Sequence, residues 1–241
     1  MNKVFIQTWP DGVWLSENHF KAFLGFDERG YEIETFTFED LFKGELELSP
    51  KTIVVGSVDA VRKAFQLLGV QPPDNIDVPE CLLEFAGRKI WDSTLGEIRK
   101  LKSPVFIKPK VTHKAFTGHV VGSFKDLIET ASLGDDFPVL VQDVVEFLSE
   151  YRVMVLRGKI LAVKPYCGDP LLFPCPNIIR RMVERYQGSC PVAYSVDVGI
   201  TPSGETLLVE VNDSFALGAY GLSRHKYIDM IEARWKEILC L

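Results

Sequence analysis

Alternation between apolar and polar residues is clearest around a short turn near the C-terminal end of the chain. The turn is Pro202-Ser203-Gly204-Glu205, and the segments on both sides of it have a period of two residues. The apolar positions are Val196, Val198 and Ile200 before the turn and Leu207, Val209 and Val211 after it. This period predicts two β-strands, and the turn joins them as a hairpin.

Three polar side chains interrupt this hairpin. If residues 202–205 form a four-residue loop, the antiparallel register sets Asp197 opposite Glu210, with Cβ atoms about 5 Å apart. Asn212 then lies on the same face as Glu210, because side chains repeat every second residue. Carboxylates on an apolar hairpin need a neutralising cation, and hard oxygen ligands suit Mg²⁺. The alternative is an ordinary hairpin whose polar face meets water.

The first part of the chain alternates between strand and helix patterns. Strands are predicted over 4–7, 31–38 and 52–56, and Ser57 caps a helix with apolar residues at helical spacing that ends at Gly69. This order predicts a small α/β lobe over residues 1–80. The proline-rich segment Gln71–Pro79 is its linker to the rest.

The second part mixes strands and helices without that regular order. Strands are predicted at 105–108 and 139–145, and a hairpin at 151–156 and 160–166 around Arg157-Gly158-Lys159. The helix starts predicted from capping residues are Thr94 in a capping box, Ser123 for a helix through Leu133, Asn177, and Ser223 for the final helix.

Bulk composition excludes several classes of protein. The chain has 241 residues, 46% of them apolar, and a formal net charge of −6, which argues against a general nucleic-acid surface. It lacks a signal-peptide pattern at the N-terminus and has no run of 18 apolar residues, so we expect a cytoplasmic protein without a membrane partner. Five cysteines without a Cys-x-x-Cys pair fit reduced thiols. These features predict no particular oligomeric state.

Basic and amide side chains at strand positions are the other candidates for chemistry. Arg152 and Lys164 interrupt apolar strands, so they either face solvent or pair with an anion. Lys108 ends its strand, where an ammonium group is either solvated or binds phosphate. Gln142 and Asp143 follow an apolar run, and they either cap that strand or bind the edge of a base.

Several short motifs together resemble the ATP-grasp superfamily. They are Phe-Ile-Lys-Pro at 106–109, Lys-Ala-Phe-Thr-Gly at 114–118, Ser-Glu-Tyr-Arg-Val at 149–153, Ala-Val-Lys-Pro-Tyr at 162–166, and Val-Glu-Val-Asn-Asp at 209–213 followed by Gly-Ala-Tyr-Gly-Leu at 218–222. Their order resembles a compact bacterial and phage clade that is distinguished by an Arg and a Lys in the large subdomain. The resemblance covers residues 88–241. It implies an α/β fold in which the N-terminal α/β lobe (1–80) precedes two α+β subdomains (81–141 and 142–241) that clamp ATP.

The resemblance also implies roles for individual residues. Lys108 and a flap lysine, Lys114, would contact the phosphates; Gln142, the Asp143 carbonyl and the Val145 amide would contact adenine; and Glu150 would contact the ribose. Arg152 and Lys164 would hold phosphate and a substrate carboxylate, while Asp197, Glu210 and Asn212 would bind Mg²⁺. The implied activity is an ADP-forming ligase that joins a carboxylate to an amine through an acyl phosphate, with small molecules or peptides as substrates.

Two departures from the family pattern and two other functions stay open. The lysine expected at the entry to the small subdomain can only be Lys89 or Arg88. Ser195 stands where several amide ligases have a basic residue, so Arg152, Arg180 or Arg181 would have to substitute for it. The alternatives to a ligase are an ATP-grasp kinase that phosphorylates a small molecule and an ATP-binding module without catalysis.

Overall fold

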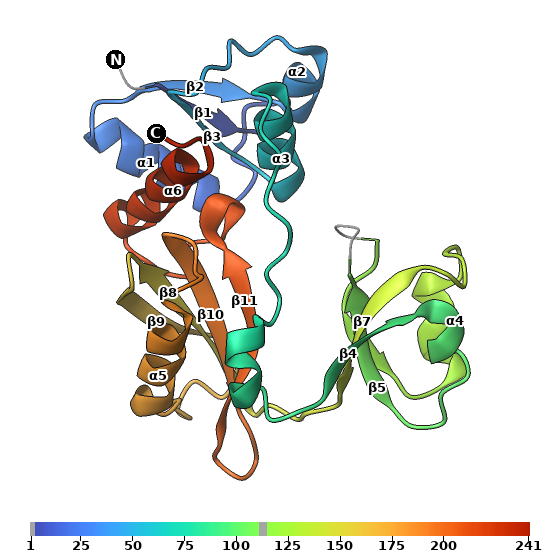
Figure 1. The fold of residues 1–241 in the computed structure, drawn as a ribbon. Helices are drawn as coiled ribbons and strands as arrows, with labels where there is room; N and C mark the ends of the chain where they lie inside the picture. Colours follow the sequence, from blue (N-terminus) through green and yellow to red (C-terminus); the bar gives the residue numbers. More distant parts are fainter. Residues whose placement is uncertain (1–2, 111–114) are drawn as a thin grey trace.

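A parallel three-stranded sheet forms the N-terminal part of the protein. The computed structural model describes residues 3–110 and 115–241, and Figure 1 shows their arrangement. The strand order is β2-β1-β3, with β1 (Lys3–Gln7), β2 (Glu32–Phe36) and β3 (Thr52–Val55). The helices of this part are α1 (Glu17–Glu28), α2 (Phe38–Lys43) and α3 (Val58–Leu67). The predicted strands are confirmed, and Ser57 caps α3 by accepting a hydrogen bond from the Ala60 amide at 3.3 Å.

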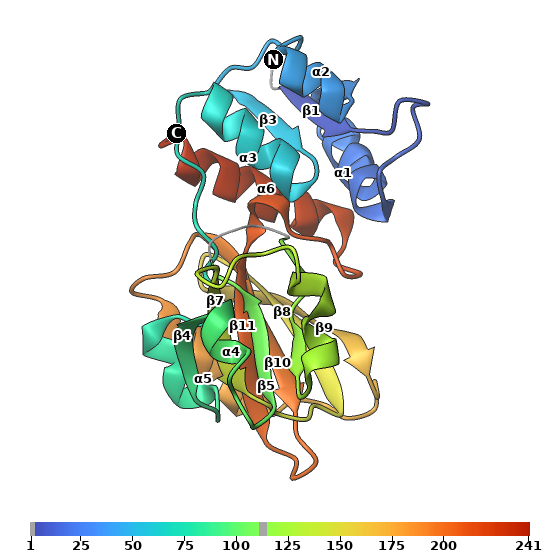
Figure 2. The same ribbon diagram turned by 90° about the vertical axis from the view of Figure 1, so that its right-hand side faces the viewer.

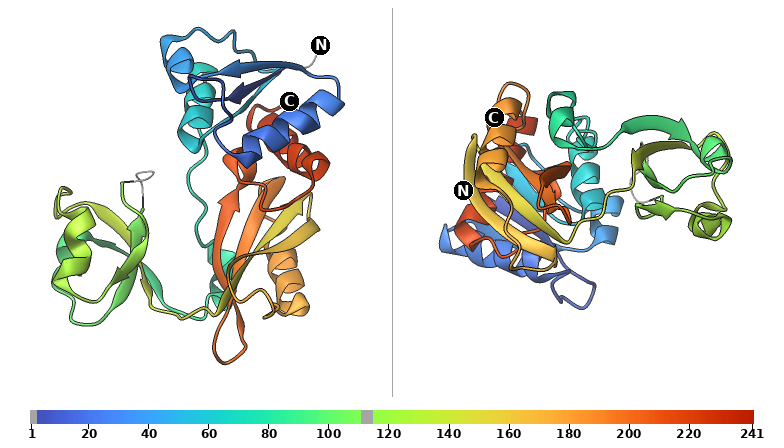
Figure 3. Two further views of the ribbon diagram at one scale, coloured as in Figure 1. Left: turned by 180° about the vertical axis from the view of Figure 1, so that it is seen from behind. Right: turned by 90° about the horizontal axis from the view of Figure 1, so that it is seen from below.

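The C-terminal helix, α6 (Arg224–Ile238), belongs to the same apolar core as this sheet. The Trp235 ring stacks on the Phe65 ring of α3 with centroids 4.7 Å apart, and both side chains are fully buried. Figures 1 and 3 show α6 between the N-terminal sheet and the remaining strands. Through α6, the C-terminal end of the chain therefore packs against the N-terminal lobe. No helix within the described residues has the length and apolar character needed to cross a membrane.

The buried His19 in α1 makes the stability of this lobe dependent on pH. Its Nδ1 lies 2.9 Å from the Ser16 hydroxyl, its Nε2 has no partner among the described residues, and burial lowers its pKa to about 4. The unfolded chain binds a proton near pH 6.5, so stability should fall as the pH drops from 6.5 to 4, by about 3 kcal/mol in total.

Urea unfolding at pH 7 and pH 4 would measure this loss. We expect His19→Asn to remove most of this pH dependence, since the side chain can still bond Ser16 but no longer titrates. His225→Asn, at an exposed position of α6, controls for the loss of a histidine. An unchanged pH dependence in His19→Asn would contradict the prediction.

An antiparallel four-stranded sheet, here called the β5 sheet, follows the linker. Its order is β4-β7-β5-β6, with β4 (Ile90–Thr94), β7 (Pro138–Asp143), β5 (Val105–Pro109) and β6 (His119–Val121). The 3₁₀ helix η1 (Glu80–Phe85) precedes β4, and the short helices α4 (Leu95–Ile98) and η2 (Phe124–Thr130) cover the sheet. Figure 3 shows this sheet set to one side and joined by the segments before β4 and after β7.

Two capping predictions in this region need correction. Thr94 precedes α4 but makes no side-chain cap, because it is the last residue of β4, and Glu97 instead accepts a hydrogen bond from the Ser93 hydroxyl. Ser123 does cap its helix, in a capping box with Asp126, but that helix is a short 3₁₀ segment that ends at Thr130 instead of Leu133.

A second antiparallel sheet, here called the β10 sheet, carries the site. Its order is β11-β10-β8-β9, with β8 (Ser149–Leu156), β9 (Lys159–Gly168), β10 (Ala193–Ile200) and β11 (Thr206–Asp213). The predicted hairpin turn is confirmed, because Arg157 and Gly158 both adopt positive φ between β8 and β9. Helix α5 (Pro176–Tyr186) begins after Cys175, so the Asn177 cap is wrong: Pro176 takes the first helical position.

The β10 sheet has one covered face and one face turned toward the β5 sheet. Alternate residues of β8 and β10, such as Tyr151, Val153 and Val196, pack against α5 and η1. The residues between them point to the opposite face, which Figure 2 shows behind the β5 sheet. The polar residues of these strands therefore lie between the two sheets.

Candidate functional site

The hairpin of β10 and β11 brings the two predicted carboxylates together. Asp197 pairs with Glu210 in the antiparallel register, as predicted. The loop is one residue longer than expected, because Ile200 pairs with Thr206, and a β-bulge between the Val198–Leu208 and Asp197–Glu210 pairs restores the register. The bulge also corrects the predicted alternation of β11: Leu208 and Val211 are buried, whereas Leu207 and Val209 are only partly buried.

Four charged residues form a row across the whole β10 sheet. Glu210 on β11 pairs with Asp197 on β10, Asp197 pairs with Arg152 on β8, and Arg152 pairs with Lys164 on β9. Because residues in register share a face, the row has two carboxylates at the β11 end and two cations at the β9 end. This polar row is the core of the candidate site.

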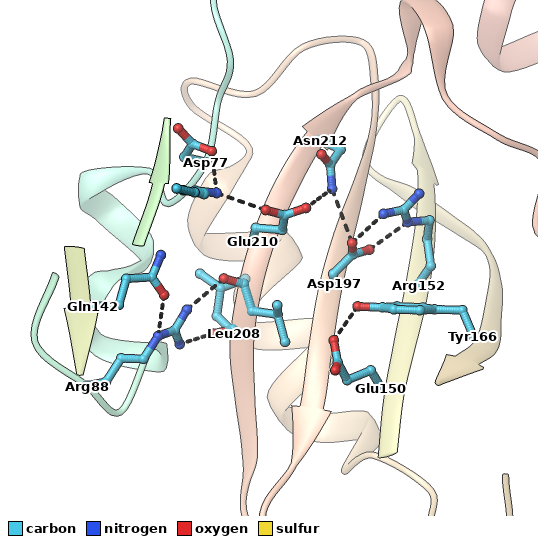
Figure 4. A network of polar contacts seen from close by, with 12 residues as sticks. Asp77, Arg88, Gln142, Glu150, Arg152, Tyr166, Asp197, Leu208, Glu210 and Asn212 are labelled. Carbon is cyan, nitrogen blue, oxygen red and sulfur yellow. Dashed lines mark hydrogen bonds and ion pairs between the residues drawn. The ribbon is translucent and has the colours of Figure 1, made fainter. Parts of the chain in front are cut away.

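Arg152 and Asp197 form a buried bidentate pair at the centre of the row (Figure 4). The Nε and Nη2 atoms of Arg152 donate to Oδ1 and Oδ2 of Asp197 at 2.8 and 2.5 Å. Burial raises the pKa of Asp197 to about 6 despite the opposing charge of Arg152. Burial also acts against the charge of Arg152, but the hydrogen bonds and the charge of Asp197 outweigh it and raise the pKa of Arg152. The guanidinium is thus a fixed cation.

Asn212 connects the two carboxylates from its position on β11. Its side-chain amide donates to Asp197 Oδ2 at 3.1 Å and to Glu210 Oε1 at 3.0 Å. In the described parts of the chain, no group of three or more His, Cys, Asp or Glu side chains could hold a metal ion. Two carboxylates and one amide oxygen still fit Mg²⁺, which takes few protein ligands and completes its shell with water and phosphate oxygens.

Lys108 crosses from the β5 sheet to this row. Its ammonium lies 2.9 Å from Glu210 Oε2 and 2.5 Å from Asp77 Oδ1, in the linker. Figure 4 labels these two acids. Burial alone would lower the pKa of Lys108, but the charges of Glu210 and Asp77 outweigh it and raise that pKa. Lys108 therefore stays charged between two acids. The predicted flap lysine, Lys114, lies outside the described residues.

Asp77 is a site residue that the sequence analysis missed. It adopts a left-handed backbone conformation with φ 55°, and its carbonyl accepts a hydrogen bond from the Val211 amide at 2.6 Å. The linker is thereby fixed to the edge of β11, where the Asp77 carboxylate reaches Lys108. Its only sequence signal was an acidic residue in a proline-rich linker.

Arg88, one of the two candidates for the lysine expected at the entry to the small subdomain, connects β7 to the β-bulge of β11. It donates to Gln142 Oε1 at 2.7 Å and to the carbonyls of Leu208 and Val209 at 2.6 and 2.8 Å (Figure 4). Lys89 instead places its ammonium 5.0 Å from the centre of the Trp91 ring. Of the two candidates for the expected lysine, Arg88 is thus committed to the carbonyl acceptors of β11.

The segment after β7 contains the residues predicted to contact adenine and ribose. Gln142 is buried and bonded to Arg88, while the amide and carboxylate of Asp143 pair with the Lys89 backbone. The Val145 amide makes no hydrogen bond with any residue in 3–110 or 115–241. Glu150 accepts a hydrogen bond from the Tyr166 hydroxyl at 2.6 Å. The structure thus brings Glu150 near the Arg152 pair and leaves Val145 available.

The basic substitutes proposed for Ser195 lie in different places. Ser195 is buried and pairs with Asn212. It lies two residues before Asp197, the partner of Arg152, on the same face of the sheet. Arg180 and Arg181 lie on α5, which packs against the opposite face of the β10 sheet, and Arg181 extends over the Phe85 ring. They cannot serve this site, so Arg152 is the remaining candidate for the missing basic residue.

A cavity of about 790 Å³, large enough for a nucleotide, lies at the acidic end of the row, where Glu210 and Asn212 line it. The linker, β5 and residues 115–118 form one side, and β11 with the 3₁₀ turn η3 (Ser214–Ala216) forms the other. Among the described residues, the charged side chains that line it are Asp74, Asp77, Lys108, Glu129, Glu210 and Asp213.

Comparison with solved structures finds the same fold in ligases of low sequence identity. D-alanine–D-alanine ligase from Bacillus anthracis matches with TM-score 0.58 and 16% identity over 99% of this chain and 98% of that one. The ATP-grasp ligase PsnB complexed with its minimal precursor matches with TM-score 0.57 and 14% identity over 97% and 99%. N5-carboxyaminoimidazole synthetase from Staphylococcus aureus matches with TM-score 0.62 and 10% identity over 97% and 77%. A search of curated protein sequences gave no match.

A scan against protein families gives a match that covers more than half of the chain. Residues 85–230 match the family described as ATP-grasp domain, R-2-K clade family 2. The matched segment contains the whole β5 sheet and β10 sheet, including all four residues of the polar row. The protein therefore belongs to the R-2-K clade of the ATP-grasp proteins, as the sequence motifs predicted.

Proposed function

We propose that this protein is an ATP-dependent carboxylate–amine ligase that forms ADP through an acyl phosphate. The observation that carries the proposal is the polar row, Glu210, Asp197, Arg152 and Lys164, with its acids at one end and its bases at the other. A metal–triphosphate has the complementary arrangement, because its cation suits the acids and its phosphoryl oxygens suit the bases.

Each end of the row has a separate task in this proposal. Asp197, Glu210 and the Asn212 oxygen would hold Mg²⁺, which neutralises phosphate charge when it is bound. Lys108, at the acidic end, would contact the phosphates together with the flap residue Lys114. Adenine would contact Gln142, the Asp143 carbonyl and the Val145 amide, and the ribose hydroxyls would contact Glu150. Arg152 and Lys164 would hold the transferred phosphoryl group and the substrate carboxylate.

The proposed reaction has two steps. A carboxylate oxygen of the first substrate attacks the γ-phosphorus of ATP, and the bond between that phosphorus and the ADP oxygen breaks. The amine of the second substrate then attacks the acyl carbon, loses a proton, and expels inorganic phosphate. Positioning and charge neutralisation are the main contributions of a protein to phosphoryl transfer, so fixed cations such as Arg152 are the expected machinery.

Release of ADP from Mg-ATP tests this proposal. We would incubate the purified protein with a panel of amino acids and short peptides, singly and in pairs, and follow ADP and products by mass spectrometry. We expect ADP only with particular pairs of a carboxylate and an amine, together with one amide product for each ADP. A phosphorylated acceptor formed without an amine would establish a kinase instead. ATP binding without turnover across the panel would favour a binding module.

A further inference from the structure

The loop that follows β11 and η3 covers the basic half of the polar row. This loop, Gly218–Gly221, places the Tyr220 ring over Arg152, with 4.2 Å between Cζ and the ring centroid. At Gly221 a Cβ atom would lie 3.9 Å from Lys164 Cε, so the loop backbone passes beside the lysine stem. Both cations of the row therefore lie beneath the 218–221 loop.

Two aromatic rings lie near Arg152, and they meet each other edge to face, with centroids 5.9 Å apart and 72° between their planes. The Tyr166 ring centroid lies 5.6 Å from Cζ, in addition to the Tyr220 ring at 4.2 Å, and the Tyr166 hydroxyl is fixed by its hydrogen bond to Glu150. An aromatic ring over the flat guanidinium stabilises it and restricts its rotation. Asp197 fixes the Nε edge of the same group. Three side chains thus determine the plane in which the guanidinium lies.

One nitrogen of Arg152 stays available in this arrangement. Nε and Nη2 donate to Asp197, whereas Nη1 donates to no residue within 3–110 and 115–241. Lys164 likewise makes no hydrogen bond or ion pair in the described chain. Arg152 Nη1 and the Lys164 ammonium are thus two cationic donor groups beneath the same 218–221 loop. This arrangement indicates an anionic ligand between them.

Tyr220 lies in a tight turn, which the Leu222 amide closes by donating to the Ala219 carbonyl, and both central residues, Tyr220 and Gly221, have positive φ. Its φ is 45°, in the left-handed region, where a bulky side chain costs about 1 kcal/mol or more. The residue is 42% exposed, so little burial offsets this cost. Unfavourable backbone conformations persist where the surrounding structure enforces them, and such places are often functional.

Contacts with α1 and α6, together with the hydrogen bond that closes the turn, fix the conformation of this loop. Asn18, in the first turn of α1, accepts a hydrogen bond from the Ala219 amide at 2.9 Å. On the other side, the Tyr227 hydroxyl of α6 donates to the Leu217 carbonyl at 2.8 Å, and the Leu222 amide donates to the Ala219 carbonyl at 2.8 Å. The loop is fixed before and after Tyr220, so its ring is directed toward Arg152.

From these contacts we infer that Tyr220 is a positioning residue, which holds Arg152 so that Nη1 binds the phosphoryl group being transferred. The inference rests on the proposed function for the identity of the ligand, an oxyanion of the γ-phosphoryl or acyl phosphate. It assigns to Tyr220 a role in the chemical step and none in ATP binding. The N-terminal lobe, through Asn18, then contributes to the geometry of catalysis.

Three variants of Tyr220 separate positioning from a merely structural role. Tyr220→Phe keeps the ring and should keep kcat within about 2-fold of the wild type. Tyr220→Leu loses the ring and should lower kcat by about 10-fold to 100-fold, while KM for ATP stays within about 3-fold. Tyr220→Gly also loses the ring but relieves the backbone, so kcat should fall as in Tyr220→Leu while the unfolding temperature is equal or higher.

A measurement without turnover distinguishes this inference from the proposed reaction. The rotation rate of the Arg152 guanidinium can be followed by NMR of its side-chain nitrogens, identified by their absence in Arg152→Lys. We expect slow rotation in the wild type and Tyr220→Phe, and faster rotation in Tyr220→Leu. Slow rotation in Tyr220→Leu, or a wild-type kcat in either ring-deleted variant, would overturn the inference. Ring-dependent rotation in a protein without ligase activity would support positioning by Tyr220 and refute only the reaction.

Discussion

Replacing Glu210 by Gln should reduce ADP formation by about 100-fold or more and leave the protein folded. The Gln side chain keeps the shape of Glu210, and its amide oxygen can still accept the hydrogen bond that Asn212 donates at 3.0 Å. It removes one of the two carboxylates proposed to hold Mg²⁺ and leaves Lys108 paired with Asp77 alone. In the proposed complex, Mg²⁺ would then lose one of its two carboxylate ligands at the acidic end of the row.

Turnover, Mg²⁺ dependence and thermal unfolding should be measured on the same Glu210→Gln preparation. Glu205→Gln is the matched control, because it makes the same change at an exposed position in the loop between β10 and β11. We expect the control to behave as the wild type, and both variants to unfold within a few degrees of it. Near-normal turnover with unchanged Mg²⁺ dependence in Glu210→Gln would refute the metal assignment.

The register of the site hairpin was predictable from sequence, but the way it is achieved was not. Pairing of Asp197 with Glu210 followed from alternation and a turn signal, which are local features. The loop has one residue more than predicted, and the bulge at Val209 shifts the register back by one residue. A prediction without the longer loop and without the bulge therefore gave the same Asp197–Glu210 pair. It failed for Leu207 and Val209, because a bulge shifts the alternation without a clear residue signal.

The missed residues are those whose roles arise from contacts between distant segments. Asp77 reaches Lys108 only because the linker pairs with Val211, 134 positions later (211 − 77). Tyr220 lies over Arg152 because a left-handed backbone directs it there. Periodicity and capping patterns describe neighbours in sequence, so they cannot show which loop crosses which strand. The Thr94 cap failed for a related reason, because Thr94 was already engaged in β4.

Replacing Arg152 by Met should abolish measurable ligase turnover and also destabilise the fold. Asp197 is 1% exposed, and Arg152 supplies both of its strong hydrogen bonds. Loss of one partner leaves an uncompensated buried charge, which costs about 3–5 kcal/mol. Low activity in this variant alone would therefore not separate a catalytic role from misfolding.

The double variant Arg152→Met/Asp197→Asn separates the two effects. With both charges removed, we expect urea unfolding to recover most of the lost stability, since replacing both members of a buried ion pair is often nearly neutral. The coupling free energy between the two substitutions should reach about 2–3 kcal/mol. ADP formation should stay at least about 100-fold below the wild type, because the variant lacks both the carboxylate proposed to hold Mg²⁺ and the cation proposed to bind the phosphoryl group. Recovery of turnover together with stability would show that Arg152 serves the fold alone, and would remove the basic end of the polar row from the mechanism.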